Sequence, residues 1–337
     1  MTVALDRRYR SVPARLFGSP AFRMVGKRLL MAIPIMLGVS VLTFWVLNLI
    51  PGNAAQQLLG AEATPEQIRA LEAQMGLNEP AVSRYFDWLG GAVTGDLGRS
   101  FVSGQDVAGQ LGERLTVSAE LTGLALIASV ALAVPVALLA ARRPDGLFDR
   151  VSMFVSVSGL SVASYVLALV LVLVFAVRFA MLPAIGYVPF AEDPVENLRG
   201  MVLPATAIAV PLFCFYTRFL RGDLVDQLQG QDYIVTAQAK GIGPWQVLLR
   251  HAFRNSSFGL ITVVGLNLST LIGSTVIIES IFAIPGLGQL MLQAINTRDV
   301  LVVQACVIVF AVVTVLANLI TDLLYAVLDP RIRYGSG

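Results

Sequence analysis

The chain has 337 residues, of which 56% are hydrophobic and only 14% are charged, with a formal net charge of +2. A water-soluble protein carries about 25% charged residues, so this composition, with a mean hydropathy of +0.75, excludes an ordinary soluble domain and indicates a polytopic membrane protein. A single histidine excludes a multi-histidine metal site within this chain. The two cysteines, Cys214 and Cys306, lie in apolar runs and are expected to be packing residues.

Six apolar runs approach or exceed the ~20 residues that a helix needs to cross the hydrocarbon core of a bilayer. We place these spans at residues 29–50, 115–141, 151–177, 201–220, 260–282 and 300–327. All are expected to be helices, because unpaired backbone groups cannot face lipid and the runs lack the alternation of barrel strands. The first run follows a basic stretch, but it is longer than the ~7–15 apolar residues of a cleaved signal peptide. We therefore expect a retained span and an all-α integral membrane fold.

The basic residues are distributed unevenly between the two sides that six spans define. Seventeen of the 24 Lys and Arg residues fall on the side of the termini, and seven fall on the other side. Because cytoplasmic segments carry the excess of Lys and Arg, both termini are expected in the cytoplasm. The predicted parts are a basic N-terminal extension (1–28), a first span (29–50), an external subdomain (51–114), a transmembrane core (115–328) that includes a cytoplasmic loop (230–255), and a cytoplasmic tail (329–337).

The external segment 51–114 is too polar for a span and too long for a simple connection. Thr64 is expected to cap a helix that starts at Pro65, with Gln67 completing a capping box, and the helix is expected to stop at Gly76. A second helix is expected within 81–93. This subdomain either fills space around the span ends or contacts a soluble partner outside the membrane.

The cytoplasmic loop contains a polar, basic interlude with two short helical patterns around a glycine. From Pro244 onward, apolar residues recur at the i, i+3, i+4, i+7, i+8 spacing of an amphipathic helix. The apolar positions are Trp245, Leu248, Leu249, Ala252 and Phe253, and the polar positions are Gln246, Arg250, His251 and Arg254. We expect this loop to bind another component.

The sequence shows no catalytic constellation. It contains neither the G-x-x-x-x-G-K-[ST] loop that holds ATP phosphates nor the H-E-x-x-H motif of zinc proteases. We expect no catalytic residue, no cofactor and no metal in this chain, and any ATP chemistry must come from a partner.

Several polar side chains fall at membrane depth, where ionisable groups are costly and often mark a pathway. Glu279 is the strongest candidate, whereas Glu120 could equally be a hydrated or paired structural group. The candidate lining residues are Ser161, Ser164, Tyr165, Asn267, Ser274, Thr275 and Glu279. The small residues among them also permit close helix packing, which is the commoner reason for their presence.

The chain from about Lys27 to Tyr334 resembles the permease subunits of ABC importers of the peptide and nickel class, in particular the first of the two paired peptide permeases. The resemblance is carried by short motifs along the whole chain. These are Arg28-Leu29-Leu30 and Leu49-Ile50-Pro51-Gly52, Thr64-Pro65-Glu66-Gln67-Ile68, Gly95-Asp96-Leu97-Gly98-Arg99-Ser100, Ala239-Lys240-Gly241, Leu248-Leu249-Arg250-His251-Ala252, Pro285-Gly286-Leu287-Gly288, and Asp329-Pro330-Arg331-Ile332-Arg333-Tyr334.

The loop departs from the general importer signature, which begins Glu-Ala-Ala and has a glycine four positions beyond the second alanine. Ala237 holds the second alanine position and Gly241 the glycine position, but Val235 and Thr236 replace the first two residues. The resemblance implies that this loop couples the permease to an ATPase. The residues implied are Asp232, Ala237, Ala239, Lys240, Gly241, Trp245, Leu248, Leu249, Arg250, His251 and Phe253.

The resemblance also implies the partners and the location. A sister permease, two cytoplasmic ATPase subunits that bind ATP and Mg, an extracytoplasmic binding protein and membrane lipid are expected, and nucleic acid is not. The location implied is the bacterial inner membrane. The substrate could be a dipeptide, a longer peptide, a nickel chelate, glutathione or haem. The main alternative is a secondary transporter, which would favour charges at the membrane midplane and an inverted repeat; a membrane enzyme and a scaffold are weaker alternatives.

Overall fold

The computed structural model describes residues 20–49, 54–60 and 63–328. Most of the predicted N-terminal extension (1–19), the exit of the first span (50–53) and the predicted tail (329–337) lie outside the described residues. The described part of the chain is built from helices and connecting segments, without a β-sheet; its isolated β-bridge joins Arg99 and Asp106. The all-helical fold class is therefore confirmed.

Five long helices correspond to predicted spans. They are α1 (Pro20–Leu49), α5 (Val107–Arg142), α8 (Pro194–Gly230), α11 (Phe253–Ile281) and α13 (Val300–Leu328). Among the described residues, four helices are long and apolar enough to cross a membrane, and up to six spans result if each of two bent pairs is counted as one. The helix α8 has 37 residues and extends beyond the predicted span 201–220 at both ends. Asp193 caps its start by accepting hydrogen bonds from the backbone N–H groups of Val195 and Glu196.

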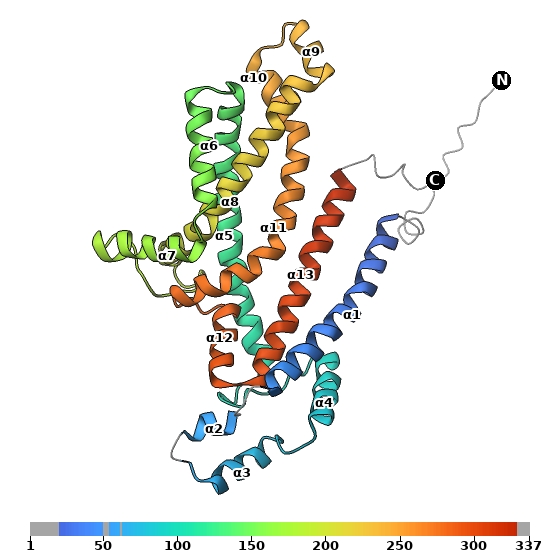
Figure 1. Ribbon diagram of the computed structural model, residues 1–337, viewed down its shortest axis with the longest axis vertical. Helices are drawn as coiled ribbons and strands as arrows, with labels where there is room; N and C mark the ends of the chain where they lie inside the picture. Colours follow the sequence, from blue (N-terminus) through green and yellow to red (C-terminus); the bar gives the residue numbers. More distant parts are fainter. Residues whose placement is uncertain (1–19, 50–53, 61–62, 329–337) are drawn as a thin grey trace, which may run out of the picture.

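The third predicted span, 151–177, is wrong as a single straight helix. The chain forms α6 (Leu147–Leu160), breaks at residues 161–163, and continues as α7 (Ser164–Leu171) and the π-helical segment η2 (Val172–Arg178), with a bend of 100°. Figure 1 shows α7 leaving the bundle sideways. One face of this arm, with Ala168, Leu171 and Val172, packs on the cluster formed by α5, α8 and α11. The sequence around the break, Ser158-Gly159-Leu160-Ser161-Val162-Ala163-Ser164, is less apolar than the runs on either side of it.

A row of small residues allows α5 and α8 to pack closely. The side chains at every fourth position of α5 from 121 to 141 are fully buried: Leu121, Ala125, Ser129, Ala133, Ala137 and Ala141. Residues four apart lie on one face of a helix, and small side chains on that face bring two backbones close together. Two core clusters form along this row, one towards each end of the bundle.

The helices α2 (Ala54–Leu59), α3 (Pro65–Gln74) and α4 (Ala81–Thr94), which fall in the segment predicted to be external, lie at one end of the molecule (Figure 1). The predicted capping box is confirmed, because Thr64 Oγ1 accepts the N–H of Gln67 at 3.3 Å and Gln67 Oε1 accepts the N–H of Thr64 at 3.0 Å. The predicted stop is also confirmed. Gly76 has a φ of +66°, a conformation that favours glycine after a helix.

Aromatic packing joins this subdomain to the first span. Phe44 of α1 packs against Tyr85 and Trp88 of α4, and the hydroxyls of Ser40 and Tyr85 are 2.8 Å apart. On the neighbouring loop, the buried Asp299 carboxylate accepts a hydrogen bond from Ser100. The helix α4 and the loop that contains Ser100 therefore pack against the rest of the chain.

The helix α12 (Leu287–Thr297), which the sequence analysis did not predict, is capped by a buried carboxylate. Glu279 Oε2 accepts the N–H groups of Gly288 at 2.8 Å and Gln289 at 3.1 Å, and Glu279 Oε1 accepts the hydroxyl of Ser118 at 2.6 Å. The Ser118 hydroxyl oxygen accepts the N–H of Leu287 at 2.8 Å. These bonds satisfy three of the N–H groups that a helix start leaves unpaired, and the negative charge is favourable at that end.

We expect Gly286→Ala to destabilise the protein, because a Cβ there would lie 2.3 Å from the Glu279 carboxyl carbon and would displace the cap. The free energy of unfolding should fall by about 2 kcal/mol. Thermal unfolding of the purified protein in detergent measures the change. Gly123→Ala in α5 is the matched control, since a Cβ there meets nothing within 4 Å. Equal stability of the two variants would contradict the capping role.

Candidate functional site

The polar loop lies at the end of the bundle opposite α2 and α3, where α8 passes into α9 (Asp232–Ala239) and α10 (Pro244–Gln246) (Figure 1). After α10 the chain continues without a gap through the π-helical segment η3 (Val247–Ala252) into α11. The predicted amphipathic helix from Pro244 therefore exists. It is not a separate element, however, because it forms the beginning of the fifth long helix.

Gly241 makes the turn between the two helical parts of the loop. Its φ is +78°, a left-handed conformation in which a Cβ is strained. The N–H of Gly241 donates to the carbonyl of Gln238 at 2.9 Å, and the N–H of Ile242 donates to the carbonyl of Ala237 at 3.2 Å. These two bonds form a Schellman motif, which satisfies the last carbonyls of α9. The glycine is therefore required by the backbone, independently of any partner.

The inner face of the loop is buried against the end of α5. Ile234 and Ala237 of α9 join Val247, Leu248 and Ala252 of η3 in one apolar cluster. Three small residues of α5, three large ones of α8 and one leucine of α11 complete this cluster: Ala133, Ala137, Ala141, Tyr216, Leu220, Leu224 and Leu260. Each fully buried aliphatic side chain contributes about 1.5–3 kcal/mol, so the loop is a folded part of the core.

Two hydrogen bonds of Tyr233 and a cation–π contact of Trp245 hold the loop. The Tyr233 hydroxyl donates to Gln227 Oε1 at 2.5 Å and accepts from Asn255 Nδ2 at 2.8 Å, which links α8, α9 and α11. The guanidinium carbon of Arg142, at the end of α5, lies 4.6 Å from the centroid of the Trp245 ring. A cation over an indole face is attracted by the ring quadrupole. The loop is therefore held from inside by α5 and α8.

The predicted coupling residues divide into a buried and an exposed group. Ala237 and Leu248 are buried by this chain, and His251 and Phe253 are half-buried. The exposed residues are Asp232, Ala239, Lys240, Gly241, Trp245, Leu249 and Arg250. Two adjacent leucines thus differ in role: Leu248 shapes the loop, and Leu249 is available to a partner. The exposed Val235, which no predicted site included, adds a further apolar side chain.

The predicted pathway residues do not converge on one site. Ser161 and Tyr165 are exposed and Ser164 is half-buried at the α6–α7 break, while Asn267 and Ser274 are half-buried and Thr275 is buried in α11. Glu279 has 0% of its surface exposed. Within this chain its carboxylate is turned inwards to cap α12, and a role in a passage stays a prediction.

Glu120, for which the sequence analysis left both roles open, accepts a hydrogen bond from the Tyr187 hydroxyl at 2.9 Å. Burial, together with the Glu120 carboxylate, raises the pKa of Tyr187 to about 12, so the phenol remains a donor at neutral pH. This contact joins α5 to the loop that follows η2.

Comparison with known families and proteins decides between the alternatives. Residues 133–334 match the family described as binding-protein-dependent transport system inner membrane component, and residues 21–122 match its N-terminal companion. The chain belongs to this family. Its members are permease subunits of ABC importers that work with a binding protein and an ATPase, so the chain is a non-catalytic, multi-pass inner-membrane permease. The comparison lends no support to a secondary transporter.

Individual relatives match over nearly their whole length. A peptide transport system permease protein of Brucella abortus is 39% identical over 311 residues, which cover 92% of this chain and 99% of that protein. The dipeptide transport system permease protein of Alkalihalophilus pseudofirmus is 35% identical, with 91% and 98% covered. The glutathione transport system permease protein of Escherichia coli is 34% identical, also with 91% and 98% covered.

We expect Gly241→Ala in this permease to loosen the loop without unfolding the bundle. An alanine held in the left-handed region costs about 1 kcal/mol, which raises the local opening equilibrium roughly fivefold. Hydrogen exchange of the backbone amides in residues 233–242 measures this. Gly243→Ala is the control, because Gly243 has an ordinary negative φ and a Cβ there meets nothing within 4 Å. Unchanged exchange in the Gly241 variant would contradict the turn assignment.

Proposed function

We propose that the loop 230–255 is the surface through which this permease binds an ATPase subunit. The observation that carries the proposal is a group of exposed apolar side chains on a loop that is otherwise polar: Val235 is 62% exposed, Leu249 48% and Trp245 38%. The basic residues Lys240 and Arg250 lie beside them and are exposed. Apolar side chains on a rigid, polar surface are characteristic of a protein contact, and an amphipathic helix commonly binds in a groove.

The other components follow from the family. A sister permease would complete the translocation path, and two ATPase subunits would bind ATP and Mg outside this chain. An extracytoplasmic binding protein would deliver the substrate to the face that carries α2, α3 and α4. Both termini would lie in the cytoplasm, in agreement with the distribution of Lys and Arg residues.

The substrate we propose is a short peptide. Three relatives that are 34–39% identical are named for the transport of peptides, dipeptides and glutathione. A nickel chelate or haem is the less supported choice, since neither occurs in these names. Nucleotide-driven closure of the ATPase subunits would move the loop, and α5 and α8 would carry that movement towards the outer side, biasing the permease pair between two states.

We expect Leu249→Glu to weaken binding of the ATPase subunits while the permease remains folded. Leu249 is half exposed, so a charge there is accommodated in water but not in an apolar contact. A loss of about 2 kcal/mol is typical for a central interface residue. Copurification from detergent measures it, with Val93→Glu on the external helix α4 as the control, since Val93 is 80% exposed. Normal recovery of ATPase subunits with Leu249→Glu would exclude this contact.

We expect uptake to require ATP and the binding protein. The whole complex, reconstituted in liposomes, should import at least one of three labelled probes, dialanine, trialanine and glutathione, and import should stop when ATP is omitted. An ion gradient should have no effect. Uptake that survives without nucleotide and collapses with the proton gradient would instead establish a secondary transporter.

A further inference from the structure

The segment 142–149, here called the α5–α6 turn, comprises the last residue of α5, the connection and the first residues of α6, and it contacts the chain both before the coupling loop and within it. Asp149 pairs with Arg221 on α8, before the loop begins, and Arg142 lies over Trp245, in the second half of the loop. The sequence analysis assigned no role to this turn. Its two contacts are more than twenty residues apart along the chain, yet they come from a segment of eight residues.

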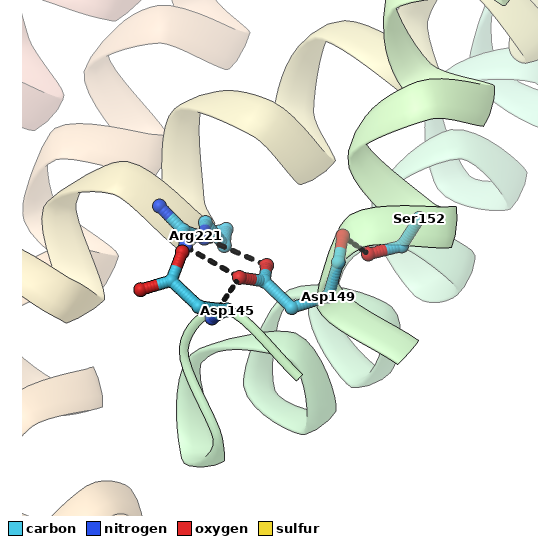
Figure 2. Close-up of polar contacts among 4 residues, drawn as sticks. All are labelled: Asp145, Asp149, Ser152 and Arg221. Atoms are coloured by element: carbon cyan, nitrogen blue, oxygen red, sulfur yellow. Dashed lines mark hydrogen bonds and ion pairs between the residues drawn. The ribbon is translucent and has the colours of Figure 1, made fainter. Parts of the chain in front are cut away.

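The Asp149–Arg221 pair is bidentate and largely removed from water. Arg221 Nε donates to Asp149 Oδ1 at 2.8 Å, and an Arg221 terminal nitrogen donates to Oδ2 at 2.5 Å. The backbone N–H of Asp145 also donates to Oδ2 at 2.8 Å, as Figure 2 shows. Asp149 is 2% exposed. A buried charge that loses its partner is strongly unfavourable, so these two charges must stay together.

The second contact places Trp245, inside the loop, beside the end of α5. The guanidinium carbon of Arg142 lies 4.6 Å from the centroid of the Trp245 ring, and Val247 and Leu248, which follow Gln246, are buried in the cluster that contains Ala137 and Ala141 of α5. The α5–α6 turn and the end of α5 therefore contact α8 ahead of the coupling loop and the second half of the loop itself.

We propose that the α5–α6 turn is a positioning element that makes the coupling loop and α5 move together. Asp149 holds α8 ahead of the loop through its ion pair with Arg221. Arg142 holds the second half of the loop through its contact with Trp245. A displacement of the loop by the ATPase subunit then displaces α5, whose small-residue row contacts α8 along the whole bundle. This inference rests on the proposed function of the loop. It adds a second segment, remote in sequence, that determines how much of the ATPase movement reaches the transport path.

A structural role alone makes a different prediction. If the ion pair only helped the permease to fold, its loss would reduce the number of working complexes, and ATP hydrolysis and peptide import would fall in the same proportion. If the turn transmits movement, hydrolysis continues while import falls. The ratio of peptide imported to ATP hydrolysed therefore separates the two roles.

The experiment uses the reconstituted complex with whichever of dialanine, trialanine and glutathione the wild type imports. The first variant is the double substitution Asp149→Asn and Arg221→Gln, which removes both charges and leaves neither one buried alone. The second is Arg142→Gln. The matched control is Arg143→Gln, the neighbouring exposed arginine, which makes none of the contacts described above.

We expect both variants to bind the ATPase subunits and to hydrolyse ATP at the basal rate of the wild type. The ratio of import to hydrolysis should fall by about fivefold in the double variant, and by less in Arg142→Gln. Arg143→Gln should match the wild type. An unchanged ratio in the double variant, or an equal fall in all three, would overturn the proposal. A wild-type complex that fails to import any probe with ATP would instead contradict the proposed function itself.

Discussion

The close packing of α5 on α8 is the interaction on which the rest of the structure depends. Six buried positions at intervals of four residues form a continuous face of α5 from 121 to 141, and five of them are alanine or serine. A membrane offers little hydrophobic driving force between helices, so the close approach that small side chains permit is what stabilises the pair. The core cluster that contains Leu121 and the cluster that buries the inner face of the loop 230–255 both include residues of this pair.

Two buried charges inside this framework are satisfied by the chain itself. Glu279 is surrounded by two backbone N–H groups and a serine hydroxyl, and Asp149 by a guanidinium and a backbone N–H. Each joins parts of the chain that are distant in sequence. A polar residue in an apolar run can therefore indicate a hydrogen-bonded contact between two helices as well as a transport passage. The residues around it in the folded structure distinguish the two.

The features that the sequence predicted correctly depend on interactions between residues that are close together in the chain. The capping box at Thr64 and the glycine stop at Gly76 involve residues within a few positions, and their chemistry can be recognised without a fold. The long apolar helices are predictable for the same reason, since length and composition alone determine whether a helix can cross a bilayer. The family motifs identified the permease class because they extend over nearly the whole chain.

The features that were missed depend on packing between distant segments. Residues 161–163, where the arm turns to cover the core, contain neither glycine nor proline, and the nearest glycine, Gly159, still lies within α6. The helix α12 was detectable, since Leu287, Leu290, Met291 and Ala294 have the spacing of one helix face. The amphipathic pattern of the loop 230–255 predicted an apolar face, but it could not show that the chain itself covers Leu248 and leaves Leu249 exposed.

The length of α8 determines how far this helix can reach beyond the core of a bilayer. A helix of 37 residues is about 55 Å long, whereas the hydrocarbon core measures about 30 Å. The helix is therefore long enough for its end at the loop 230–255 to reach beyond the hydrocarbon core. In a helix of this length, a small tilt becomes a displacement of several ångströms at its far end.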